Sequence, residues 1–250
     1  MKKLILSLPL LCCVFFIFTA KAQDTPGKPQ NYISISAGLS APMASFKQAD
    51  YGATGGGANN KAGFAKKGVM YDFEGGFYVH KNWGFAVSLT YQDQGRLNTD
   101  DVTNLSNGYR VDGSAYTSTV TASKRYSSFN LMVGPQYNFN LGSKFIVDAR
   151  VVAGGIKSFS SPNIVVVLDN YEGTQTSTFT QYSSKAFAFA YGGSVALTWK
   201  ISDGVGIVLR ENVIDSPTGI SIKNDAHSGR YVDHQPISVY QTSLGLRFAL

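Results

Sequence analysis

The chain has 250 residues, a length that fits one large domain or two small ones. Both cysteines, Cys12 and Cys13, lie in an apolar N-terminal run, so the rest of the chain can form no disulfide and has no thiol chemistry. The formal net charge of +6 includes three lysines within the first 21 residues, so charge gives no case for a nucleic-acid-binding protein.

The N-terminal residues have the pattern of an export signal. Lys2 and Lys3 precede the apolar run LILSLPLLCCVFFIFT, and Ala20-Lys21-Ala22 follows as a small-residue cleavage site. We therefore predict a signal peptide over 1–22 and a single mature domain over 23–250. A retained membrane anchor is the alternative.

After residue 22 the dominant pattern is alternation of apolar and polar residues with a period of two. No segment there has sustained helical periodicity, and no apolar run approaches the ~18 residues of a membrane-spanning helix. Eight alternating segments have about the ~9 to 11 residues with which a tilted strand crosses a bilayer. The predicted strands are 32–40, 69–80, 84–94, 126–140, 144–156, 185–199, 205–214 and 237–250.

The connections between these segments alternate in length. The short, polar ones, suited to hairpin turns, are 81–83, 141–143 and 200–204. The long ones, rich in Gly, Ser, Thr, Asn and Asp, are 41–68, 95–125, 157–184 and 215–236. This asymmetry is typical of outer-membrane barrels, with turns in the periplasm and loops outside. We predict an all-β, eight-stranded antiparallel up-and-down transmembrane β-barrel with both termini in the periplasm.

The residue types on the two strand faces indicate which face meets lipid. A soluble barrel places apolar residues inside, whereas a membrane barrel places them outside. The polar face here mixes glycines such as Gly134 and Gly154 with long charged side chains, which suits a narrow lumen. The lumen charges that we predict are Asp72, Glu74, Arg150 and Arg210 in an upper layer and Asp148 and Arg247 in a lower layer.

Counting from the short turns places Glu74, Arg150 and Arg210 at similar depth, roughly 15 Å into the barrel. An unpaired buried charge would be strongly unfavourable. We therefore expect the two carboxylates of the upper layer to pair with its two arginines, and Asp148 to pair with Arg247. The favoured interpretation is a polar plug, and a conducting or substrate-selecting lumen is the alternative.

Aromatic residues of the apolar face gather at both ends of the strands. Such bunching is typical of girdles at the two bilayer interfaces, although aromatics are common in strands generally. The girdle predicted beside the short turns and the C-terminus is Trp83, Phe85, Tyr137, Phe139, Phe145, Trp199 and Phe248. The girdle predicted toward the long loops is Tyr71, Tyr91, Tyr126, Phe129, Phe187, Phe189 and Tyr240.

Two residues depart from a regular pattern. Glu211 falls on the lipid face, where a carboxylate at depth is costly, so we expect it at headgroup level or displaced by a bulge. Pro135 removes a backbone donor from a strand with neighbours on both sides. With Gly134 before it, we expect a bulge or a lost ladder hydrogen bond.

The signal, the strand set, V-G-P-Q-Y at 133–137 and S-L-G-L-R-F-A-L at 243–250 resemble the OmpA transmembrane-domain and OmpX type of barrel, the outer membrane protein beta-barrel domain family of Gram-negative bacteria. The resemblance implies an outer-membrane location among lipid and lipopolysaccharide, and insertion by the barrel-assembly machinery. Such proteins usually end in an aromatic residue. Because this chain ends in Leu250, we expect Leu246, Phe248 and Leu250 to act together as the assembly signal.

The expected function is structural or surface-interacting, with long loops presented to ligands, host surfaces or an envelope protein partner. A narrow porin and a barrel subunit of a secretion or assembly complex are the alternatives. We expect no catalysis, cofactor or metal, because the loop containing Asp225, His227, Ser228, Asp233 and His234 matches no hydrolase spacing and is a weak metal signal.

Two further patterns concern the long loops. The Gly-rich stretch 54–63 lacks the G-K-[ST] of a phosphate-binding loop, so we expect an ordinary loop. The alternating Ser/Thr stretches 114–123 and 174–184 are expected to extend hairpins above the membrane, where their edges could pair with a partner.

Overall fold

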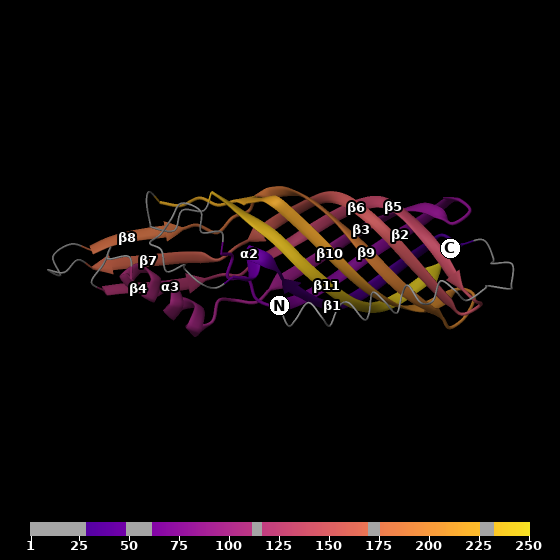
Figure 1. Cartoon of the computed structure of the whole chain (residues 1–250), viewed down its shortest axis with the longest axis horizontal. Helices are drawn as coiled ribbons and strands as arrows, with labels where there is room; N and C mark the ends of the chain where they lie inside the picture. Colours follow the sequence, from indigo (N-terminus) through magenta and orange to yellow (C-terminus); the bar gives the residue numbers. More distant parts are fainter. Residues whose placement is uncertain (1–28, 49–61, 112–116, 170–175, 226–232) are drawn as a thin grey trace.

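The computed structural model describes residues 29–48, 62–111, 117–169, 176–225 and 233–250. The predicted signal peptide and most of the Gly-rich stretch lie outside these ranges. The described residues form a closed barrel and a smaller sheet beyond one of its ends (Figure 1). Among them, no helix is long and apolar enough to cross a membrane.

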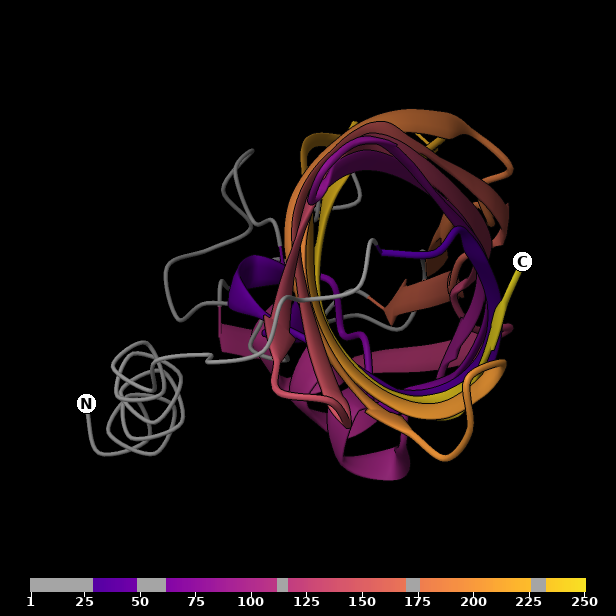
Figure 2. The ribbon, with the colours of Figure 1, turned by 90° about the vertical axis from the view of Figure 1, so that its right-hand side faces the viewer.

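The barrel consists of eight strands, each paired antiparallel with the next, and the pairing of β1 with β11 closes the ring (Figure 2). The predicted architecture is therefore confirmed. The strands are β1 (Tyr32–Pro42), β2 (Gly68–His80), β3 (Trp83–Gln94), β5 (Ser127–Leu141), β6 (Phe145–Ser160), β9 (Phe187–Lys200), β10 (Val205–Ser221) and β11 (His234–Ala249).

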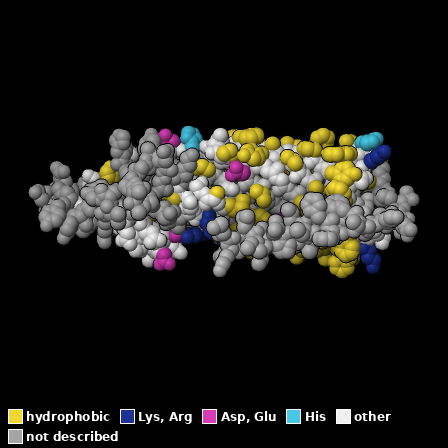
Figure 3. All heavy atoms as spheres, in the orientation of Figure 1, with side chains coloured by type: hydrophobic (Ala, Val, Ile, Leu, Met, Phe, Trp, Pro, Cys, Tyr) yellow, Lys and Arg dark blue, Asp and Glu magenta, His cyan; other side chains and the backbone are white. Residues whose placement is uncertain are grey.

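The alternation of residue types along each strand turns apolar side chains outward. On β9, for example, Phe187 and Phe189 are 66% and 55% exposed, whereas Ala188 between them is 5% exposed. On the face seen in Figure 3, yellow apolar side chains gather along the visible part of the barrel, and dark-blue Lys and Arg atoms lie at both ends of this belt. Because this polarity is inverted relative to a soluble barrel, the chain is a membrane-spanning barrel of the outer-membrane type.

A second unit, which we call the head, stands above the loop end of the barrel (Figure 1). It contains the sheet β4-β7-β8 and one helix packed on β4. The expectation that the Ser/Thr stretches extend barrel hairpins is wrong, because β4 and β8 both pair with β7 instead. The head elements are α3 (Thr99–Val111), β4 (Thr117–Ser123), β7 (Asn163–Asp169) and β8 (Thr176–Gln181).

Helix α3 also corrects the expectation of a chain without helices. Asn98 caps it reciprocally with Asp101: each residue's backbone N–H donates to the other's side-chain oxygen at 2.9 Å. Leu105 from this helix is fully buried against the sheet. The head core combines three of the long loops and consists of Ala62, Phe64, Leu105, Val120, Ile164, Val166 and Leu168.

Neither irregular residue causes a bulge. The pairing of β5 with β6 is interrupted at Gly134 and Pro135, but Val133↔Ala153 and Gln136↔Arg150 keep one register, so the effect is lost ladder pairing alone. Glu211 keeps regular pairing with Thr242, whose Oγ1 donates a hydrogen bond to its carboxylate at 2.7 Å. A cross-strand hydrogen bond therefore partly offsets the cost of this outward carboxylate.

Candidate functional site in the barrel lumen

The upper layer of the lumen is an ion-pair cluster centred on Glu74. Arg150 forms a bidentate contact with this carboxylate, with Nη2 at 2.7 Å from Oε1 and Nη1 on Oε2. Arg210 donates from Nη2 to Glu74 Oε1 at 2.7 Å and from Nη1 to Asp72 Oδ2 at 3.1 Å. The period of two along β2, β6 and β10 turns all four side chains into one cross-section.

Tyr32 joins this cluster and was not among the predicted lumen residues. Its hydroxyl donates to Glu74 at 2.9 Å and accepts from Arg150 Nη2 at 2.6 Å. Gly76 leaves room for the ring, since a Cβ there would lie 2.0 Å from it. The alternation along β1 could have indicated this position, because Tyr32 lies an even number of residues from the inward-facing Ser34 and Ser40 and so shares their face.

The lower layer pairs Asp148 with Arg247. Asp148 also accepts hydrogen bonds from the Tyr78 hydroxyl at 2.5 Å and from Asn138 Nδ2 at 2.9 Å. The guanidinium carbon of Arg247 lies 3.6 Å from the ring centroid of Tyr32, a cation–π contact that joins the two layers. All six predicted charges are at most 7% exposed.

Toward the loop end, the inside of the barrel contains an apolar cluster, next to the buried and hydrogen-bonded side chains of Ser40, Gln92 and Gln241. Phe46 enters this group from the short helix α2 (Ala44–Lys47), and its ring contacts that of Tyr126 edge-on at 4.8 Å. Tyr126 is 5% exposed and donates to Gly63 O at 2.9 Å, so it points inward and does not belong to the girdle. We call this group the apolar cap: Phe46, Ala65, Tyr126, Met132, Ile156, Ala188, Ala190, Ile214, Ile220, Ile222, Ile237 and Val239.

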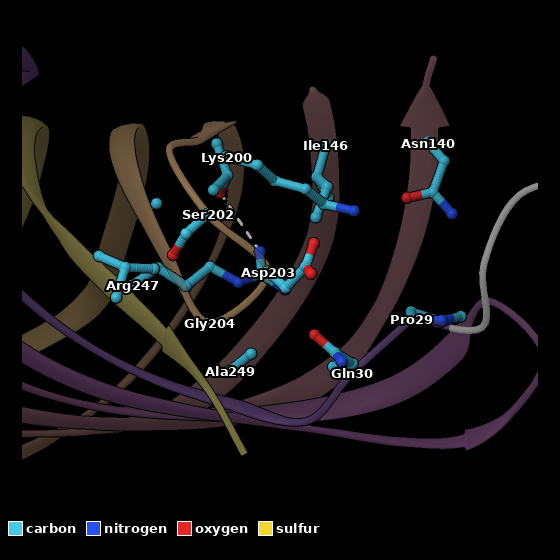
Figure 4. A pocket seen from close by; sticks show the side chains of 13 residues that line it. Pro29, Gln30, Asn140, Ile146, Lys200, Ser202, Asp203, Gly204, Arg247 and Ala249 are labelled. Carbon is cyan, nitrogen blue, oxygen red and sulfur yellow. Dashed lines mark hydrogen bonds between the residues drawn. The ribbon is translucent and has the colours of Figure 1, made fainter. Parts of the chain in front are cut away.

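Two cavities border the charged layers. One, of about 20 Å³, lies between the upper layer and the cap, which is space for about one water molecule. Arg150 and Arg210 line it, and the Nε–H of each has no hydrogen-bond partner among the residues that the structure describes. The other, of about 280 Å³, is a vestibule at the short-turn end, where Asn140 and Asp203 face the cavity and Arg247 lies at its inner wall (Figure 4).

The other predicted girdle residues face outward at the two levels. Ring pairs link several of them across strands: Trp83 with Tyr137 at 4.9 Å and Tyr91 with Phe129 at 5.4 Å. The exposed outward aromatics include Tyr71, Trp83, Phe85, Phe129, Phe145, Phe187, Phe189, Trp199 and Tyr240. Tyr91, Tyr137, Phe139 and Phe248 share this face and are half-buried.

The C-terminal residues Leu246, Phe248 and Leu250 share the outward side of the β1–β11 seam. Leu246 and Leu250 are 41% and 67% exposed, and Phe248 is half-buried. They form one apolar strip at the end of the barrel opposite the head. Recognition of this strip by the assembly machinery stays a prediction.

The loop considered for catalysis is not assembled into a site among the described residues. His227 and Ser228 lie outside them, and His234 is the first residue of β11. Asp225 instead accepts a hydrogen bond from the Tyr182 hydroxyl at 3.3 Å, which raises the pKa of that phenol. No group of three metal-ligating side chains occurs in the described part of the chain.

Comparisons with known proteins give structural matches alone. No family model matches the sequence, and no curated protein matches it. Neisserial surface protein A has 11% identity and a TM-score of 0.47, with 90% of this chain and 100% of that chain covered. Ail, the attachment invasion locus protein of Yersinia pestis, has 12% identity and a TM-score of 0.42, with 88% of this chain and 100% of that chain covered. The outer membrane protease OmpT from Escherichia coli has 8% identity and a TM-score of 0.33, with 90% of this chain and 98% of that chain covered. These similarities are too low to carry over a function.

Proposed function

We propose that this protein is a closed outer-membrane barrel that anchors a folded head at the cell surface, where the head contacts ligands or a protein partner. The observation that carries the proposal is the paired upper layer. Glu74, Arg150 and Arg210 come from three different strands and satisfy one another across the lumen. A barrel of eight strands has an interior just wide enough for side chains to fill, which agrees with a plug.

The apolar cap supports the same function. A solute crossing the lumen would have to part the charged layers and then pass a fully buried Phe46. Water and ions are poorly accommodated by an apolar constriction. The narrow-porin alternative requires a continuous wet path through both regions.

The head supports a surface role rather than transport. Its core draws residues from three loops, and its sheet is joined to the fourth through the bridge between Gln181 and Asn224. A compact unit of this kind presents a fixed surface, unlike separate loops. Catalysis forms no part of the proposal, and membership of a secretion or assembly complex is the second alternative.

Single-channel recording in planar bilayers tests the proposal. The refolded protein is expected to give no stable open level, whereas a steady conductance of porin size would overturn the plug. The variant Arg150→Ala, Arg210→Ala empties the centre of the upper layer and is expected to conduct more than the wild type. Co-purification in mild detergent tests the second alternative, membership of a secretion or assembly complex. An envelope protein that still co-purifies in stoichiometric amount after the head is deleted would contradict a role mediated by the head.

A further inference from the structure

The vestibule at the short-turn end is larger than the cavity beneath the cap, and it lies on the side that faces the periplasm in barrels of this type. Its volume is about 280 Å³. With about 30 Å³ for each water-sized group, this space holds about nine non-hydrogen atoms, the size of an amino acid or a small dipeptide. Neither the plug nor the head uses this space, so the proposed function leaves it without a role.

Backbone hydrogen bonds hold one wall of the vestibule in place. In the turn between β9 and β10, the N–H groups of Ile201 and Ser202 donate to the carbonyl of Val205 at 2.9 and 3.0 Å. Gly204 in the same turn accepts from the N–H of Ala249 at 2.9 Å, which joins the turn to the end of β11. Because the backbone of this wall is fixed before a ligand arrives, less ordering is required on binding.

Two cations line the vestibule, Lys200 from β9 and Arg247 from β11. Arg247 uses Nη1 for its ion pair with Asp148, whereas its Nη2 lies 3.5 Å from the Tyr78 hydroxyl, a long and therefore weak hydrogen bond. The side chain of Lys200 extends toward Ile146 (Figure 4), and among the described residues it forms no ion pair. The vestibule therefore offers positively charged N–H donors of the kind that bind a carboxylate.

One carboxylate and two amides also line the vestibule. Asp203 is exposed, and its carboxylate faces the cavity (Figure 4). The amides of Gln30, just before β1, and of Asn140, near the end of β5, point into the same cavity (Figure 4). Asp203 suits an ammonium group, and side-chain amides can both donate to and accept from a peptide group. A negative charge in the same cavity as the cations disfavours a polyanion such as phosphate and favours a zwitterion.

We propose that the vestibule binds a zwitterion of dipeptide size on the periplasmic side of the barrel. The carboxylate of the ligand contacts Lys200 and Nη2 of Arg247, and its ammonium group contacts Asp203. Its peptide group forms hydrogen bonds with the amides of Gln30 and Asn140. Charge complementarity at both ends selects a zwitterion, and the cavity volume selects a short one. Because the vestibule lies on the periplasmic side of the charged layers, binding requires no opening of the plug.

An NMR titration of the full chain, isotope-labelled and refolded in detergent, with glycylglycine as the probe measures this site. The backbone signals of residues 200–206 are expected to shift and to saturate. Glycylglycine amide lacks the carboxylate and N-acetylglycylglycine lacks the ammonium group. Each is expected to bind about tenfold more weakly than glycylglycine, the size of one charge-assisted hydrogen bond. Inorganic phosphate is expected to give no saturating shift of these signals.

Two substitutions assign the two ends of the ligand. Lys200→Gln is expected to bind glycylglycine about tenfold more weakly and to lose most of the preference over the amide, whereas Asp203→Asn is expected to lose the preference over the acetylated dipeptide. Lys81→Gln is the matched control, because it removes a short-turn lysine that does not line the cavity, and it is expected to bind like the wild type.

Heat-modifiable migration on a gel verifies that each variant is folded. The proposal is overturned if glycylglycine gives no saturating shift, if K200Q binds it like the wild type, if K81Q loses as much affinity as K200Q, or if phosphate binds as tightly as the dipeptide.

Discussion

Replacing Glu74 by glutamine tests whether the upper layer is a structural plug. The side chain keeps its shape but loses the charge that both arginines contact. Arg210 retains Asp72 at 3.1 Å as a partner, whereas Arg150 retains no ion pair within its own layer. The variant therefore leaves one buried guanidinium without a matching carboxylate.

The magnitude follows from burial and geometry. Glu74 is 1% exposed and Arg150 is 7% exposed, so water can solvate little of the guanidinium charge that the substitution leaves unpaired. Two unit charges about 4 Å apart interact by about 4 kcal/mol at an effective dielectric constant of about 20. Removing one partner of a buried pair typically costs about 3–5 kcal/mol. We expect E74Q to lower the free energy of unfolding by that amount.

Urea unfolding in lipid vesicles, followed by gel migration and by fluorescence of Trp83 and Trp199, measures the change. Glu211→Gln is the matched control, because it makes the same substitution on the outward face and is expected to shift the free energy by less than about 1 kcal/mol. Adding Arg150→Met to E74Q removes the orphaned charge and is expected to restore part of the loss. Equal shifts for E74Q and E211Q would refute the reasoning.

Three further changes test other parts of the barrel. Gly76→Ala pushes a Cβ into the ring of Tyr32 and is expected to destabilise by about 1–3 kcal/mol, whereas Gly75→Ala, whose Cβ would meet its nearest atom at 3.4 Å, serves as the mild control in the same urea assay. Phe46→Ala removes a buried ring from the cap and is expected to cost about 3–5 kcal/mol, visible as faster proteolysis of the loops. Pro135→Ala restores a backbone donor, so amide exchange near residue 135 is expected to slow, and unchanged exchange would contradict the lost pairing.

The barrel could be predicted from the sequence because its signals are local. Alternation with a period of two fixes which side chains share a face, and the contrast between short turns and long loops fixes the order of the strands. The predicted strand ends were least accurate where the strands continue above the membrane. Strand β6 continues to Ser160 and β10 to Ser221, beyond the apolar pattern that marks the bilayer.

The head and the apolar cap could not be predicted in the same way, because they depend on contacts between distant loops. Phe46 and Tyr126 are 80 positions apart in the sequence. The residues around each of them give no sign of their contact, which forms only in the closed barrel. Helix α3 has a usable local signal in the Asn98 and Asp101 pair. The apolar periodicity of this helix is weak, because the helix buries few side chains besides Leu105 and its neighbours. For that reason the helix could not be predicted from periodicity.

The composite origin of the head has an immunological consequence. Val120, Val166 and Phe64 meet in one core although they belong to three loops separated by barrel strands. Antigenic determinants formed across the head are therefore discontinuous in sequence and exist only once the barrel has closed. Antibodies raised against single loop peptides are expected to miss these determinants, whereas antibodies raised against the folded protein are expected to lose binding when one loop is exchanged.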